Sequence, residues 1–123
     1  MTRLIVCCDG TWNTPGQTEN GLPAATNVSK FRLALAAADR DGVRQDVYYH
    51  PGVGTDGGLW NRLVGGGLGE GLDDHIRSAY RWLARNWRPG DSIHLMGFSR
   101  GAYTARVGAG LVLRWSLDFW GNA

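Results

Sequence analysis

Ile93-His94-Leu95-Met96 leads directly into Gly97-Phe98-Ser99-Arg100-Gly101, and this stretch is the strongest indication of the fold. The apolar run predicts a short buried strand, and the helix-like stretch 102–113 follows the second glycine. A G-x-S-x-G pattern between a strand and a helix is typical of a nucleophile elbow, in which a strained turn holds the serine at the strand's carboxyl end. Glycines flank such a turn because strand and helix pass too closely for side chains. The pattern therefore indicates a nucleophilic Ser99.

The other periodic segments place this unit in a larger fold. Apolar runs predict strands at 4–8 and 43–50, and amphipathic spacing predicts helices at 27–38 and 70–87. Thr26 or Asn27 is suited to cap the first helix. Residues 11–25 are rich in turn formers and predict a long loop, and 59–68 predict an irregular or short helical segment. The alternating order indicates an α/β fold, with a parallel sheet, flanking helices and right-handed crossovers.

The composition of the chain indicates a small globular domain without a disulfide framework or a membrane span. The 123 residues suffice for one small domain, and 43% hydrophobic and 20% charged residues are ordinary for a globular chain. A net charge of +2 does not demand an anionic partner, so no nucleic-acid partner is predicted. Adjacent Cys7 and Cys8 should point to opposite faces of a strand, which argues against a disulfide framework and for a reducing, cytoplasmic setting. The run 4–8 is too short for a signal peptide or a membrane span, so at most peripheral membrane contact is expected.

A second motif follows the first strand. Asp9-Gly10-Thr11 should lie at the same sheet edge as Ser99, because ligands bind at the carboxyl ends of parallel strands. The N–H groups of Thr11 or Gly10, together with that of Arg100, are candidates for an oxyanion hole. An equally good interpretation is a tight turn in which Asp9 caps its own loop, and the two are compatible. An aspartate-nucleophile phosphatase is excluded, because Cys7 stands where its nucleophile would be.

Two further patterns in the sequence each allow more than one interpretation. The first is a formal match to the G-x-G-x-x-G dinucleotide fingerprint at 52–57 (GVGTDG). No clear helix follows it directly, and the acids at 73–74, which have about the spacing of a ribose-binding acid, lie on a predicted helix rather than at the end of a strand. Nucleotide binding is therefore the weaker alternative. No phosphate-binding loop with lysine exists, no group has metal-ligand spacing, and no cofactor is predicted. Four arginines at helical spacing form a stripe that is either a solvated face or a contact for anionic lipid or another polyanion: Arg77, Arg81, Arg85 and Arg88.

Three blocks in order resemble a known family: 8–13 (CDGTWN), 48–55 (YYHPGVGT) and 97–104 (GFSRGAYT). They are similar to an α/β-hydrolase-like family that includes the catalytic domains of type VI secretion phospholipase effectors. The resemblance implies a partial α/β-hydrolase fold and a Ser-Asp-His hydrolase acting on lipid or another ester. It carries Ser99 over as the nucleophile of an acyl-serine intermediate, with Asp9, Gly10 and Thr11 as the loop beside it. Delivery by a signal-independent secretion system is compatible with it.

The chain departs from this family in two ways. No histidine follows Ser99, and Asp118 is the only acid after it, whereas α/β hydrolases place both partners downstream. Of the histidines before it, His75 is predicted to be structural and His94 to lie in the core, and His50 alone should end a strand on the serine's edge. The resemblance covers 3–106, and 107–123 diverge.

These departures predict that residues 1–123 are the N-terminal portion of a single larger hydrolase domain, cut or frameshifted after the helix that follows Ser99. Without a base the serine hydroxyl is a poor nucleophile, so a catalytically incomplete serine hydrolase is expected. The competing functions are a non-catalytic binding module that keeps the turn as a scaffold and, less favoured, nucleotide binding through 52–57.

Overall fold

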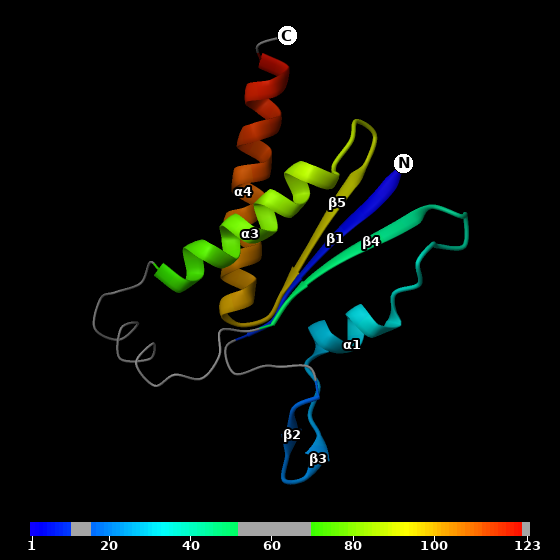
Figure 1. Ribbon diagram of the computed structural model, residues 1–123, viewed down its shortest axis with the longest axis vertical. Coiled ribbons are helices and arrows are strands. Elements are labelled where there is room, and N and C mark those ends of the chain that lie inside the picture. Colours follow the sequence, from blue (N-terminus) through cyan, green and yellow to red (C-terminus); the bar gives the residue numbers. More distant parts are fainter. Residues whose placement is uncertain (11–15, 52–69, 122–123) are drawn as a thin grey trace.

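The computed structural model describes residues 1–10, 16–51 and 70–121 (Figure 1). Its main sheet has three parallel strands in the order β4-β1-β5, and the strands are β1 (Thr2–Cys8), β4 (Arg44–His50) and β5 (Ser92–Gly97). The described helices are α1 (Asn27–Ala34), α3 (Glu70–Asn86) and α4 (Arg100–Gly121). The expected α/β class, a parallel sheet with flanking helices, is confirmed.

The central strand β1 carries the core. Its residues from Leu4 to Cys8 are all buried, as an unbroken apolar run predicts for a strand covered on both faces. Because side chains alternate along a strand, Leu4, Val6 and Cys8 face one side of the sheet, and Ile5 and Cys7 face the other. Two separate hydrophobic clusters result, one on each face.

Helices α3 and α4 cover the first face. Buried Ala79 and Leu83 of α3 pack against the even-numbered residues of β1, and Val112 of α4 joins the same cluster. The rings of Tyr48 and Trp82, whose centroids are 5.4 Å apart, extend it over β4. Figure 1 shows α3 and α4 lying across this side of the sheet. This face is closed by two long helices.

Helix α1 covers the second face. Its N-cap is Thr26, one of the two residues predicted for this role. The Thr26 hydroxyl accepts a hydrogen bond of 3.0 Å from the Ser29 N–H. Val28 is buried against Ile5 and Cys7. This face therefore depends on one short helix.

Three local features differ from the expectation. Helix α1 ends at Ala34, before residue 38, because Ala37 uses its carbonyl to accept a hydrogen bond of 2.8 Å from the Gln45 N–H at the start of β4. Helix α4 begins at Arg100 and continues to Gly121, well beyond 102–113. Within the expected loop 11–25, the described part forms a hairpin of β2 (Thr18–Glu19) and β3 (Leu22–Pro23).

Candidate active site

Ser99 lies between β5 and α4 with its backbone in the left-handed region. Strand β5 ends at Gly97 and α4 begins at Arg100, so Phe98 and Ser99 form the whole connection. The φ angle of Ser99 is 54°, a conformation that is uncommon for a residue with a side chain and that clusters at functional sites. Ser99 is exposed and precedes the first residue of the helix, whose N-terminus favours negative charge. The turn therefore presents its hydroxyl to solvent at a favourable place for an anion.

The two glycines of the pentapeptide are required by close backbone contact. A Cβ atom on Gly97 would collide with the Gly101 carbonyl, and a Cβ on Gly101 would collide with the carbonyls of Cys8 and Asp9. The carbonyl of Phe98 accepts from the Gly101 N–H, and that of Ser99 accepts from the Ala102 N–H, both at 2.9 Å. The start of α4 therefore packs directly on the end of β1, and any larger residue at 97 or 101 displaces the turn.

The end of β1 is joined to the neighbouring strand ends on both sides. The Phe98 N–H donates to the Cys8 carbonyl at 3.1 Å, and the Asp9 N–H donates to the His50 carbonyl at 3.0 Å. Asp9, Ser99 and His50 thus belong to the same carboxyl edge of the sheet, as the parallel topology predicts.

Buried Asp9 is the hydrogen-bond centre of this edge. Its carboxylate accepts from the Gly10 N–H at 3.1 Å, the Thr26 hydroxyl at 2.9 Å and the Tyr49 hydroxyl at 2.8 Å. The local cap that the sequence offered as one interpretation is present, and two distant side chains join it. Asp9 therefore ties the loop after β1 to the N-terminus of α1 and to β4.

Tyr49 is the residue at this edge that sequence reasoning missed. Burial and the hydrogen bond to the Asp9 carboxylate both raise the pKa of Tyr49, so its phenol stays protonated and donates. The Arg32 guanidinium lies 4.6 Å from the centre of its ring. Two features of the sequence pointed to Tyr49: it lies in the block 48–55 that resembles the family, and strand alternation places it on the same face as α1.

Two of the three candidate oxyanion donors, Gly10 and Arg100, lie within the described residues. The Gly10 N–H already donates to Asp9, and the Arg100 N–H directly follows Ser99 at the start of α4. Thr11 lies outside the described residues, as does the glycine-rich stretch 52–57 that suggested a nucleotide site. Asp74, which has roughly the spacing of a ribose-binding acid, is exposed on α3.

The three histidines have partners other than Ser99 in the described part of the chain. His50 makes a 2.6 Å contact with the Pro51 carbonyl through Nδ1, and its ring stacks on that of half-buried His75 with a centroid distance of 3.8 Å. The expected core position of His94 is wrong, because its side chain is exposed and contacts the Ser92 hydroxyl at 3.2 Å. His94 fails to be buried because α1 does not extend over β5.

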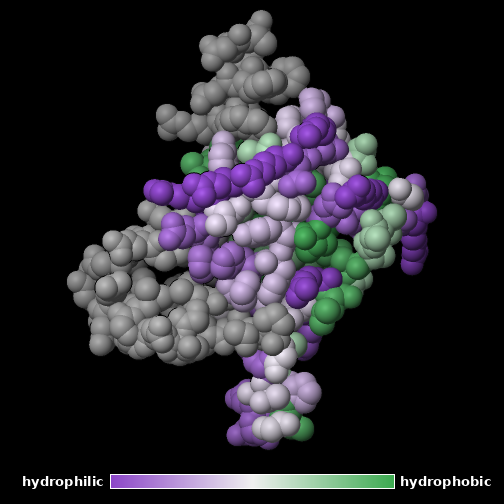
Figure 2. Space-filling model, in the orientation of Figure 1, coloured by the Kyte–Doolittle hydropathy of each residue, from purple (hydrophilic) through white to green (hydrophobic). Residues whose placement is uncertain are grey.

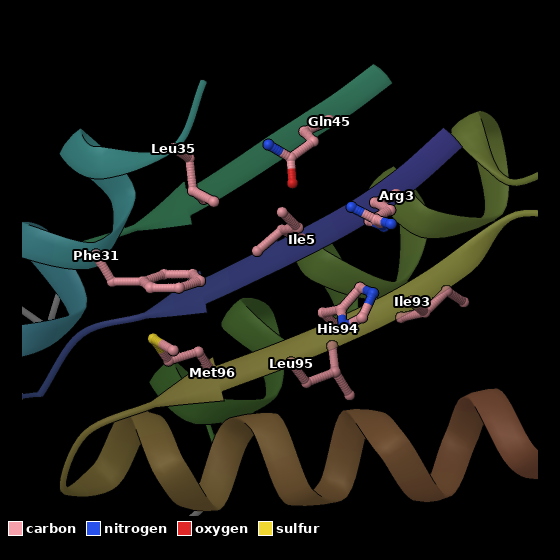
Figure 3. A pocket seen from close by; sticks show the side chains of 9 residues that line it. All are labelled: Arg3, Ile5, Phe31, Leu35, Gln45, Ile93, His94, Leu95 and Met96. Atoms are coloured by element: carbon pink, nitrogen blue, oxygen red, sulfur yellow. The ribbon is translucent and has the colours of Figure 1, made fainter. Parts of the chain in front are cut away.

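A hollow of about 780 Å³ opens on the α1 face, away from Ser99 (Figure 3). Eight helical residues span about 12 Å, whereas the seven residues of β1 span about 23 Å, so α1 covers only part of this face. Neither Asp9 nor Ser99 contributes to the lining, which consists of Arg3, Ile5, Phe31, Leu35, Gln45, Ile93, His94, Leu95 and Met96. The hollow and the serine turn are therefore separate features.

Comparison with known proteins identifies the family. Residues 2–117 match the family model described as T6SS phospholipase effector Tle1-like, catalytic domain. The chain belongs to this family. The match continues past Arg106, where the resemblance was expected to end, into the second half of α4.

A yeast protein is also similar to this chain. Uncharacterized protein YEL023C of Saccharomyces cerevisiae is 36% identical over 126 residues, covering 91% of this chain and 17% of the yeast protein. The chain thus spans about a sixth of the length of that relative. No solved structure matches the chain.

Proposed function

We propose that Ser99 is the nucleophile of a serine esterase that acts on lipid or another ester. The observation that carries the proposal is the positive φ of Ser99 in a two-residue connection from β5 to α4, held by contacts that only glycine permits at 97 and 101. A strained turn of this kind is retained where a side chain must be presented in one orientation. Membership in a phospholipase family supports the same chemistry.

The proposed reaction proceeds through an acyl-serine. The Ser99 hydroxyl oxygen attacks the ester carbonyl while a base removes its proton, and the resulting oxyanion accepts hydrogen bonds from the Arg100 N–H and the Thr11 N–H. The carbonyl then re-forms, the bond to the alcohol breaks, and the alcohol leaves with the proton. Water attacks the acyl-Ser99 ester in the same way and releases the acid. Asp9 serves as a positioning residue in this scheme, because its carboxylate holds Gly10, Thr26 and Tyr49.

In the described part of the chain, none of the three histidines makes a hydrogen bond to Ser99. His50 and His75 stack on each other, and His94 lies with Ser92 on the side of the sheet that α1 partly covers. We therefore propose that this chain by itself is catalytically incomplete. Loss of a nucleophile–base pair typically lowers the rate by about four to six orders of magnitude.

Chemical rescue tests both parts of the proposal. The purified chain is incubated with a p-nitrophenyl ester, with and without added imidazole as an external base, and acylated peptides are located by tandem mass spectrometry. We expect slow acylation at Ser99 that rises with imidazole concentration. Ser99→Ala should lose this adduct, whereas Ser78→Ala, at an exposed serine of α3, should retain it.

Two results would contradict these statements separately. Acylation that is unchanged in Ser99→Ala would remove Ser99 as the nucleophile and leave a non-catalytic module as the better function. Rapid turnover without imidazole that Ser99→Ala abolishes would confirm the nucleophile but show that a complete site exists within these residues.

A further inference from the structure

The solvent face of α3 carries an arginine ladder, which we define as Arg77, Arg81, Arg85 and Arg88. At 100° per residue these positions lie within an arc of about 80°, and along the axis they extend over about 16 Å. The buried Ile76, Ala79 and Leu83 are centred on the opposite side of the helix. All four arginines are exposed, and Figure 2 shows the hydrophilic band that runs along α3. The ladder is therefore a continuous cationic strip directed away from the core.

Among the described side chains, acids lie near the two ends of the ladder but form no ion pair with it. Among the side chains that the structure describes, the ion pairs are Arg3 with Asp39 and Arg44 with Asp46, and none involves the ladder. Asp74 shares the arc one turn before Arg77. At the other end, the Asp91 carboxylate accepts from the Arg88 N–H at 2.8 Å, and the Arg88 side chain donates to the carbonyls of Arg85 and Trp87. Like charges four residues apart destabilise a helix, so an external anionic surface would relieve a repulsion built into α3.

We propose that the arginine ladder docks this domain onto an anionic membrane surface. Guanidinium groups bind phosphate oxygens through paired donors, and a run of basic residues on one helix face is suited to a surface of negative headgroups. The proposal rests on the proposed function in one respect: an enzyme that hydrolyses a membrane lipid has to meet its substrate at the bilayer. The proposed contact is peripheral. Among the described residues, no helix has the length and apolar character of a membrane span.

The position of α3 connects the ladder with the serine edge. His75, at the beginning of the helix, stacks on His50, the last residue of β4, so the N-terminal turns of α3 lie over the carboxyl ends of the strands. Arg77 is therefore the end of the ladder nearest the edge that bears Ser99. A bilayer lying along α3 would therefore meet the domain at the helix whose first turns lie over that edge.

The charge of the whole chain favours a membrane over nucleic acid. The net charge is only +2, and the described surface also carries exposed acids, including Glu19, Asp41 and Asp74, so the molecule is not basic overall. Nucleic-acid binding by phosphate contacts needs a positive surface that follows a backbone, usually in a broadly basic domain. A single short strip beside a lipid-hydrolase site fits a flat layer of headgroups better.

Vesicle co-sedimentation tests the docking without any need for activity. The chain is mixed with vesicles of phosphatidylcholine alone or of equimolar phosphatidylcholine and phosphatidylglycerol, at about 0.05 M and about 0.5 M salt. The ladder variant is Arg81→Glu/Arg85→Glu, whose new acids can pair with Arg77 and Arg88, so the helix should remain stable. The matched control is Lys30→Glu/Arg40→Glu, which makes the same change in net charge at exposed positions outside α3.

We expect binding to the anionic vesicles that the higher salt removes, and a loss of at least about ten-fold in the ladder variant. The control variant should stay within about three-fold of the parent chain. Equal losses in both variants, equal binding to neutral vesicles, or tighter binding to an oligonucleotide than to anionic vesicles at the same salt would overturn the proposal. Because Ser99 takes no part in sedimentation, failure here leaves the acylation result standing, and the reverse also holds.

Discussion

On one face of the sheet, Leu4, Val6 and Cys8 lie beneath α3 and α4, whereas on the other face Ile5 and Cys7 are covered by α1 alone. The same strand builds both faces, so the difference comes from the length of the covering helices. Parallel sheets are ordinarily buried on both sides, and the hollow beside α1 is where that condition is not met. The serine turn belongs to the closed side, because α4 begins at the turn and packs there. Stability and reactivity should therefore differ between the faces in measurable ways.

The largest effect should follow from Gly101→Ala. The added methyl group would collide with the carbonyls of Cys8 and Asp9, which are backbone atoms and cannot turn aside. We expect the free energy of unfolding to fall by about 3 kcal/mol or more, measured by urea denaturation. Gly108→Ala is the control: it lies in the same helix with open space around it, and should raise the stability by up to about 1 kcal/mol. Equal results at the two positions would mean that the turn does not pack on β1.

A matched pair of leucine truncations compares the two faces directly. Leu83→Ala removes a side chain that is 4% exposed in the α3 cluster, and should cost about 2–5 kcal/mol in the free energy of unfolding. Leu35→Ala removes a half-buried side chain that borders the hollow, and should cost less than about 1.5 kcal/mol because less apolar contact is lost. Equal costs would show that the α1 face is packed as well as the other.

The adjacent cysteines lie on opposite faces of the sheet, so the reaction rate of each thiol reports how readily its own face opens. Burial raises the pKa of both thiols, that of Cys8 to about 11, so each should react slowly with a disulfide reagent at neutral pH. Cys8→Ser leaves the thiol beneath α1, and Cys7→Ser leaves the one beneath α3 and α4. We expect the Cys7 thiol to be modified about ten-fold faster, because its face opens more readily. A faster reaction at Cys8 would reverse the ranking of the faces.

The sequence was informative where structure is local. The G-x-S-x-G pentapeptide was enough to predict a sharp turn at Ser99, and Thr26 was one of the two residues predicted to cap α1. The Asn20-Gly21 pair, with φ angles of 52° and 77°, was a readable hairpin signal that the turn-rich composition concealed. Contacts between distant segments could not be predicted from the sequence. The hydrogen bonds from Thr26 and Tyr49 to the Asp9 carboxylate, for example, join residues that are 17 and 40 positions apart.

The prediction that His94 lies in the core was wrong for the same reason, because burial depends on contacts between distant segments. Alternation along β5 states which side of the sheet a residue faces, but it does not state whether a helix covers that side. His94 faces the side where α1 stops short, so it is exposed although its strand is apolar.

The smallest effect concerns pH and the pair of rings at the end of α3. Burial, and next the charge of His50, lower the pKa of His75, so the folded chain favours the neutral imidazole. The unfolded chain binds the proton more readily, and its pKa is about 6.5, so stability should be full above that pH and fall as the pH decreases toward 5. Because His75 is only half-buried, the loss should be less than about 1 kcal/mol.

Substitution of His75 isolates this contribution. Thermal denaturation between pH 5 and pH 8 should show a smaller decrease of Tm at acid pH in His75→Gln than in the parent chain, because the glutamine does not titrate. His94→Gln makes the same change at an exposed histidine on the other face and should leave the pH profile as it was. The carboxylates of Asp39 and Asp91 have lowered pKa values, chiefly because backbone N–H groups donate to them, so they titrate below this window. A profile that His94→Gln flattens and His75→Gln does not would place the acid sensitivity on the α1 face and reverse this part of the comparison.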